Sequence, residues 1–189
     1  AVQVAIDFAK EHADETLIIV TADHETGGMT IGFATTAYDT HFNYLTSQKI
    51  SFADFDAVIA DLREKNAAFE DALEAVKTYY GLTTEADQPL SLTESDVQAL
   101  KAAFELSMTA KDARKENAED ALLYGGYEPF SMAVSHIMNN KAGLSYTSYA
   151  HTGLQIPVYA QGVGAQTFSG LYDNTDIFNK TMDVMGLNE

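Results

Sequence analysis

The chain has 189 residues with 28 acidic side chains against 11 basic ones, and this formal net charge of −17 repels a phosphate backbone, so we expect no nucleic-acid partner. It contains no cysteine, so any metal ion must be held by His, Asp or Glu. Hydrophobic residues make up 46% of the chain, enough for a core of ordinary size, but no apolar run approaches the roughly 18 residues that a membrane span needs.

The first part of the chain predicts a helix followed by a strand. Residues 2–11 carry apolar side chains at helical spacing, and the sequence starts directly in this pattern at Ala1, so we expect the chain to be part of a longer protein. The unbroken apolar run Leu17–Val20 predicts a strand buried on both faces of a parallel sheet, as the second half of a βαβ unit. Residues 29–34 predict a second extended segment.

A carboxylate and an imidazole stand side by side just beyond this predicted strand. Asp23 and His24 are both of metal-ligand type, and open α/β sheets bind ligands beyond the carboxyl ends of their strands. Gly27 and Gly28 then allow a sharp turn or a close backbone approach. The local pattern fits equally well with a simpler interpretation, in which Asp23 caps a turn and His24 is an ordinary polar residue.

The composition changes in the middle of the chain. Residues 37–124 are rich in Ala, Glu, Asp and Lys, and their apolar residues recur at helical spacing with a single proline, Pro89. Capping patterns at residues 51–54 and 93–96 predict helix starts, and Gly81 predicts a helix end. We interpret the aromatic stripe of these helices as core, because its spacing matches amphipathic burial. The sequence therefore predicts a mainly helical insertion at 37–124 within an α/β domain formed by residues 1–36 and 125–189.

The α/β pattern resumes after the insertion. Pro129 predicts the first residue of a helix that runs to about residue 141. Short strands are expected at 144–147 and 156–160, and a last helix at about 174–185. His151 lies in the loop between the two strands, and by itself it is no more than a polar loop residue.

Two motifs together resemble the carboxy-terminal part of bacterial alkaline phosphatases. The first is TLIIVTADHETGG at residues 16–28, and the second is HTG at residues 151–153. The closing segment agrees with the family in the stretches PVYAQG, FSG and DNTD at residues 157–162, 168–170 and 173–176. The resemblance covers residues 1–36 and 125–187 but not the helical middle. It implies an α/β fold in which the chain forms part of a three-layer alkaline-phosphatase-like sheet with a helical insertion.

The resemblance also implies a two-zinc site. Asp23 and His24 would both bind one zinc ion, and His151 would bind its neighbour. Two metal ions of this kind clamp the attacking and leaving oxygens of an in-line displacement. Family members form a phosphoserine on a serine nucleophile and also hold magnesium. The implied substrate is a small phosphomonoester, and the implied location is periplasmic or extracellular.

Several parts of the family pattern do not occur in these 189 residues. There is no Asp-Ser pair, the motif of the nucleophilic serine, so no catalytic residue is assigned. No histidine follows an aspartate by four positions, the spacing of the other ligands of the second zinc ion. The two arginines, Arg63 and Arg114, both fall in the predicted insertion and are not expected to clamp a phosphate. We therefore expect a carboxy-terminal portion that is inactive alone, with an exposed sheet that favours association, for example as a homodimer.

Two other interpretations remain open from the sequence. A related metal-dependent phosphodiesterase, sulfatase or phosphomutase would share the fold and some ligands, and the nucleophile of the longer protein would distinguish them. A non-enzymatic metal- or protein-binding module would instead use the helical insertion as its working part.

Overall fold

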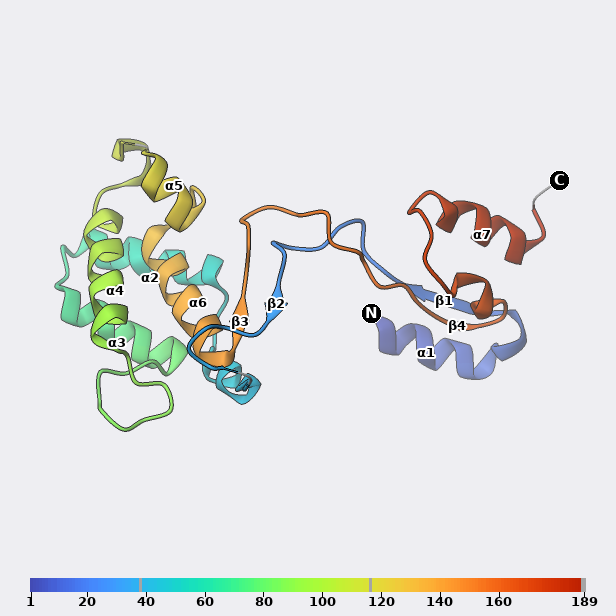
Figure 1. Ribbon diagram of the computed structural model, residues 1–189, viewed down its shortest axis with the longest axis horizontal. Helices are drawn as coiled ribbons and strands as arrows, with labels where there is room; N and C mark the ends of the chain where they lie inside the picture. Colours follow the sequence, from blue (N-terminus) through green and yellow to red (C-terminus); the bar gives the residue numbers. More distant parts are fainter. Residues whose placement is uncertain (38, 116, 188–189) are drawn as a thin grey trace. The chain divides into compact units, whose positions relative to one another are not determined.

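The computed structural model describes residues 1–37, 39–115 and 117–187, and the chain divides into two compact units (Figure 1). The terminal unit consists of Ala1–Gly28 and His151–Glu189, and the helical unit consists of Met29–Ala150. None of the helices in the described ranges is both long and apolar enough to cross a membrane.

The terminal unit is built on one pair of strands. Its elements in chain order are α1 (Val2–Glu11), a 3₁₀ turn (Ala13–Glu15), β1 (Leu17–Val20), β4 (Tyr159–Gly162), a 3₁₀ turn (Ala165–Phe168) and α7 (Asp176–Met185). β1 pairs with β4 in the antiparallel direction, with Leu17 opposite Gly162 and Val20 opposite Tyr159. α1 packs on β1, and α7 packs on the second 3₁₀ turn.

β1 is not the doubly buried parallel strand that its apolar run predicts. Within the described residues it pairs only with β4, in the antiparallel direction, and its residues are half-buried or, for Val20, exposed. The prediction was wrong because a run of apolar residues reports a tendency to be buried, while partner and direction depend on segments far away in the sequence. β4 also begins later than the predicted 156–160 strand, since Pro157 has no N–H to donate to a ladder.

The helical unit contains most of the regular structure. Its elements are β2 (Thr30–Ile31), a 3₁₀ helix (Phe42–Ser47), α2 (Phe52–Glu64), α3 (Phe69–Tyr80), α4 (Glu94–Ser107), a 3₁₀ turn (Lys111–Ala113), α5 (Ala118–Tyr124), α6 (Pro129–Ala142) and β3 (Leu144–Ser145). β2 and β3 form a second small antiparallel sheet, with Thr30 opposite Ser145.

α6 is the central helix of this unit and packs against α2, α3, α4 and α5 (Figure 1). Phe55, Tyr80, Leu100 and Phe130 are fully buried around it. The rings of Phe55 and Tyr80 pack edge to face with their centroids 5.2 Å apart, a favoured aromatic geometry. The interpretation of the aromatic stripe as core is confirmed for Phe55 and Tyr80, whereas Phe52 at the start of α2 is 39% exposed. The contacts also place α6 with the helices before it, whereas the insertion boundaries at 37 and 124 stay a prediction.

The helix ends follow local sequence signals. Ser51 accepts a hydrogen bond from the Asp54 N–H at 3.1 Å, which caps α2. Thr93 and Asp96 form a reciprocal capping box at the start of α4. Gly81 ends α3 with φ of 73°, a left-handed conformation that glycine adopts without strain.

Both arginines of the chain serve the fold of the helical unit. Arg114 donates to the two carboxylate oxygens of Glu128 at 2.7 and 2.9 Å, and Arg63 donates to Oε2 of the same carboxylate at 3.1 Å. The Arg114 side chain is 9% exposed and that of Glu128 is 12% exposed, so the pair is largely shielded from water. These contacts agree with the expectation that neither arginine clamps a phosphate.

Substitution of Gly162 should disrupt the terminal unit. Gly162 has φ of +106°, and an added Cβ would collide with the Thr16 carbonyl oxygen beside β1. Gly170 has a similar φ of +96° but open space around it. We expect Gly170→Ala to cost about 1 kcal/mol through backbone strain alone, and Gly162→Ala to cost about 3 kcal/mol or more because strain and collision combine. Hydrogen exchange of the β1 and β4 amides measures this, and equal effects of the two variants would contradict the steric argument.

Substitution of Asp56 should stabilise the helical unit at neutral pH. Burial raises the pKa of Asp56, the Ser131 hydroxyl partly offsets this, and Glu128 raises the pKa further, while Oδ1 has no hydrogen-bond partner. Because the pKa is raised in the folded state, the ionised carboxylate costs stability at pH 7, and this cost disappears as the pH falls through the folded-state pKa.

We therefore expect Asp56→Asn to melt at a higher temperature than the parent chain at pH 7 and to lose this advantage in acid. Asp112→Asn, which changes the charge equally at an exposed position, is the control. Thermal melts followed by circular dichroism at pH 7 and pH 4 measure the difference, and a lower melting temperature for Asp56→Asn at pH 7 would count against the assignment.

Candidate functional site

The candidate site lies at one end of the β1–β4 pair. β1 runs toward this end and β4 starts from it, with Val20 opposite Tyr159. The loop after β1 and the loop before β4 therefore leave the sheet together. A hydrogen bond from Thr21 Oγ1 to the Pro157 carbonyl, at 3.3 Å, links the two loops at their base.

Asp23 and His24 present donor atoms to the same region. The chain has left the strand conformation here, so the two neighbouring side chains are not forced onto opposite faces. Asp23 Oδ2 lies 3.7 Å from His24 Nε2. Two donors that each bind one zinc ion at about 2.0–2.2 Å are separated by a distance of this size. Both side chains are open to solvent, with exposures of 89% for Asp23 and 44% for His24.

The ring of His24 is oriented by its own loop. Nδ1 lies 2.7 Å from the Glu25 carbonyl oxygen, and because a carbonyl can only accept, Nδ1 carries the proton in this contact. In the neutral imidazole the lone pair is then on Nε2, the atom that faces Asp23. Histidines that bind metals commonly donate their other ring N–H to a carbonyl in this way.

His151 joins this pair from the second loop. The ring centroids of His24 and His151 are 4.4 Å apart, with the planes tilted by 33°. The structure thus brings together all three residues that the sequence singled out, Asp23, His24 and His151, from two motifs that are far apart in the chain.

Glu25 is a site residue that sequence reasoning missed. Its carboxylate accepts the Thr152 N–H through Oε1 and the Gly28 N–H through Oε2, and so connects the two loops. The Thr152 side chain contributes most to lowering the pKa of Glu25, and the N–H groups of Gly28 and Thr152 and the charge of His151 add to this against the effect of burial.

The available signal for Glu25 was its position between two ligand-type residues and a pair of glycines. Gly27 and Gly28 have φ of 92° and 64°, which turns the backbone sharply, and the Gly28 N–H donates to the glutamate. A search for metal-ligand types alone could not give Glu25 this role, because its partners are backbone N–H groups.

The donor types fit zinc, but the donors in this chain form only part of a set. Two imidazoles and a carboxylate are typical zinc ligands. Across the described ranges, no three or more His, Asp or Glu side chains are arranged to hold one ion. Asp23 Oδ2 and His24 Nε2 bring two donors within 3.7 Å of each other, compared with the three protein ligands typical of catalytic zinc.

The other three histidines pack against side chains that are not part of the candidate site. His12 stacks on Phe8 with ring centroids 4.3 Å apart, and His41 stacks on Tyr44 at 4.9 Å. His136 is half-buried in α6, and burial lowers its pKa.

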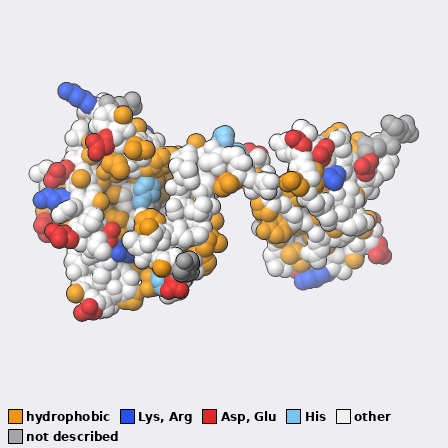
Figure 2. Space-filling model, viewed as in Figure 1, with side chains coloured by type: hydrophobic (Ala, Val, Ile, Leu, Met, Phe, Trp, Pro, Cys, Tyr) orange, Lys and Arg blue, Asp and Glu red, His pale blue; other side chains and the backbone are white. Residues whose placement is uncertain are grey.

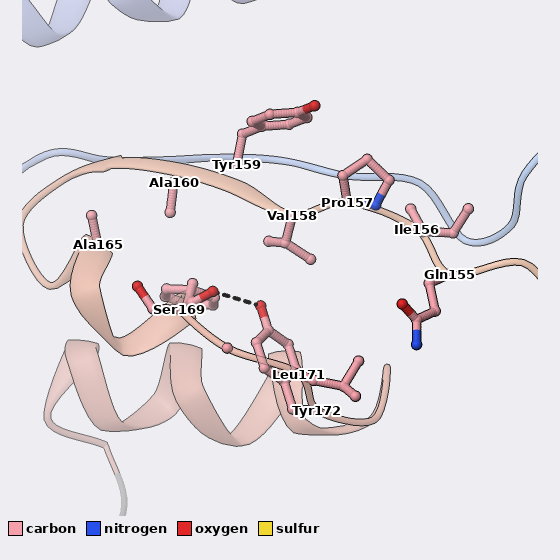
Figure 3. A pocket seen from close by; sticks show the side chains of 12 residues that line it. Gln155, Ile156, Pro157, Val158, Tyr159, Ala160, Ala165, Ser169, Leu171 and Tyr172 are labelled. Carbon is pink, nitrogen blue, oxygen red and sulfur yellow. Dashed lines mark hydrogen bonds between the residues drawn. The ribbon is translucent and has the colours of Figure 1, made fainter. Parts of the chain in front are cut away.

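A separate pocket of the terminal unit lies between β4 and the segment that leads to α7 (Figure 3). It has a volume of about 740 Å³, and Val158, Leu171 and Tyr172 are among its lining residues. The Tyr172 hydroxyl donates to the Phe168 carbonyl at 3.1 Å. The described residues that line it include no Asp, Glu or His, so the ionisable groups of the candidate site lie elsewhere.

Comparisons with known proteins agree on one family. The sequence model of the alkaline phosphatase family matches residues 1–187. The chain is 31% identical to alkaline phosphatase 3 of Bacillus subtilis over 192 aligned positions, which cover 100% of this chain and 34% of that protein. It is 30% identical to alkaline phosphatase 4 of the same organism over 95% of this chain and 31% of that protein.

A solved structure shows the same fold. The crystal structure of a cold-active alkaline phosphatase from a psychrophilic Shewanella species matches with a TM-score of 0.68 and 24% identity, over 100% of this chain and 38% of that one. The chain has the α/β architecture of this fold and spans about a third of the length of the relatives that it matches. It belongs to the alkaline phosphatase family.

Removal of the Glu25 carboxylate should loosen the contact between the two loops. Glu25→Gln keeps one carbonyl oxygen and loses one of the two backbone hydrogen bonds, whereas Glu25→Ala loses both. We expect the hydrogen-exchange protection of the Thr152 amide to be highest in the parent chain, lower in Glu25→Gln and lowest in Glu25→Ala. Glu11→Gln, an exposed position of the same unit, is the charge-matched control. Unchanged protection in Glu25→Ala would refute the role of this residue.

Proposed function

We propose that this chain is a carboxy-terminal part of a zinc-dependent alkaline phosphatase that hydrolyses phosphomonoesters through a phosphoserine intermediate. Membership of the family supports the class of reaction. The observation that carries the assignment of residues is the meeting of His24 and His151, whose ring centroids are 4.4 Å apart at the end of the β1–β4 pair.

In this proposal the zinc ligands come from both loops. Asp23 and His24 bind one zinc ion, and His151 binds its neighbour. When bound, two such ions supply the positive charge that activates a nucleophile and stabilises a leaving oxygen. A chain with a net charge of −17 has little positive surface to attract a phosphate ester, so metal ions in the site would balance the substrate charge. Magnesium belongs to the longer protein in the same proposal.

The residues of this chain prepare the site before any ion binds. The hydrogen bond from His24 Nδ1 to the Glu25 carbonyl directs the lone pair of Nε2 toward Asp23. The Glu25 carboxylate holds the Thr152 N–H, and with it the neighbouring residue His151, against the loop of Asp23 and His24. The site therefore has its ligand loops tied together by contacts that do not use the ligand atoms.

Part of the catalytic machinery must be supplied from outside these 189 residues. The sequence has no Asp-Ser pair for the nucleophile, and both arginines bind Glu128 in the helical unit. We expect this chain alone to have no phosphatase turnover. A periplasmic or extracellular location and association into homodimers belong to the same proposal. Association is supported by exposed apolar side chains of the terminal unit, among them Val4 and Phe8, exposed by 73% and 57%.

Hydrolysis of p-nitrophenyl phosphate with added zinc and magnesium tests the proposal. The longer protein that carries this sequence should be active, and His151→Ala in it should lower activity by about 100-fold, because a metal ligand is lost. His12→Ala, which removes a histidine that contacts Phe8 and Glu15 in the same unit, should leave activity within about twofold, since these contacts lie at the surface.

Two results would overturn the proposal. Robust turnover by the 189-residue chain would show that the site is not incomplete. Full activity of the longer His151→Ala variant, with unchanged zinc content by elemental analysis, would remove His151 from the site.

A further inference from the structure

A partly open cavity of about 520 Å³ lies at the surface of the helical unit, between the segment that joins α4 to α5 and the start of α6. Leu106, Tyr124 and Pro129 contribute apolar surface to it, and Ala118 and Ala121 of α5 also line it. Tyr124 is 9% exposed, so this wall is well shielded from water. The volume lies within the range of small-molecule sites, roughly 300–1,000 Å³.

Positive charge is concentrated at this cavity. Three of the chain's 11 basic residues, Lys111, Arg114 and Lys115, line it, although the chain carries 28 acidic residues. Arg114 is paired with Glu128 at 2.7 Å. Lys111 and Lys115 are exposed, and neither ammonium group forms an ion pair within the described part of the chain.

The described residues of the wall carry one negative charge, that of Asp120, against the three basic side chains. Asp120 is the acidic residue among the described lining residues, and its Oδ2 accepts a hydrogen bond from the Asn117 side chain. Burial raises the pKa of Tyr124, helped by Asp120 and Glu119, so that the side chain stays a neutral phenol. Tyr124 lines the cavity from the last turn of α5.

We propose that this cavity binds a small organic anion with an aromatic body and one oxyanion group. The body would lie against Leu106, Tyr124 and Pro129, and the oxyanion would lie at the Lys111 and Lys115 ammonium groups. An apolar wall beside two unpaired cations matches such a ligand in both polarity and charge. None of these residues belongs to the candidate phosphatase site, so this site is separate from the proposed function.

Titration of the full 189-residue chain with 2-naphthoate tests the proposal by isothermal titration calorimetry and ligand-observed NMR. Two related probes separate the contributions: 2-naphthamide keeps the body without the charge, and acetate keeps the charge without the body. We expect saturable binding of naphthoate, and at least about 10-fold weaker binding of each of the other two, because each lacks one of the two matching features.

Variants locate the site. Lys111→Glu with Lys115→Glu should weaken naphthoate binding by about 10-fold through charge reversal. Ala121→Trp should abolish the binding, because the indole fills the cavity from an exposed helix position. The matched control is Lys49→Glu with Lys101→Glu, which makes the same charge change at two exposed positions of the same unit and should stay within about twofold of the parent chain.

Several outcomes would overturn the proposal. Absence of saturable naphthoate binding in the parent chain, or binding that survives Ala121→Trp in a variant with an unchanged circular dichroism spectrum, removes the site. Equal affinity for naphthoate and naphthamide, or equal weakening by the control pair, removes the role of Lys111 and Lys115.

Discussion

The antiparallel pairing of β1 with β4 is the constraint on which the candidate site depends. Because Val20 lies opposite Tyr159, the end of one strand and the start of the other face the same side of the sheet. The loop with Asp23 and His24 and the loop with His151 must then leave the sheet together. The hydrogen bonds of Thr21 and Glu25 across the loops fix this arrangement locally. The pairing, rather than either motif, makes one site from two short stretches.

The two compact units are stabilised in different ways. The helical unit has a continuous core in which Phe55, Tyr80 and Phe130 are fully buried, and side chains cap the starts of α2, α4 and α5. The terminal unit has few buried side chains, and Phe178 is 66% exposed. Hydrophobic side chains are visible on the face of this unit that Figure 2 shows. A surface of this kind is typical of a contact area. The unit that carries the candidate ligands thus depends more on strand pairing and loop hydrogen bonds than on a core.

The few basic side chains of this acidic chain lie outside the candidate site. In a chain with a net charge of −17, both arginines are held by one glutamate inside the helical unit. The candidate site contains no arginine or lysine among the described residues. The unpaired Lys111 and Lys115 instead line a separate cavity. Positive charge therefore serves the fold and a second surface, while the candidate site is built from imidazole and carboxylate groups.

The sequence by itself determined the features that depend on neighbouring residues. Helix α1 and the start of α6 at Pro129 agree with prediction because caps and 3.6-residue periodicity act within one or two turns. The ligand-type residues Asp23, His24 and His151 were also visible, since they follow from residue identity and motif. The last helix begins two residues later than predicted, at Asp176, because the first turn of a helix frays.

Only the tertiary structure decided the partner and direction of β1, the grouping of α6 with the helices before it, and the role of Glu25. Each depends on contacts between distant segments. The Glu25 carboxylate binds a backbone N–H 127 positions away, and no local pattern records that distance. Strand pairing is likewise set by which edge is available after the chain has folded back, so the apolar run of β1 could specify burial but not its partner.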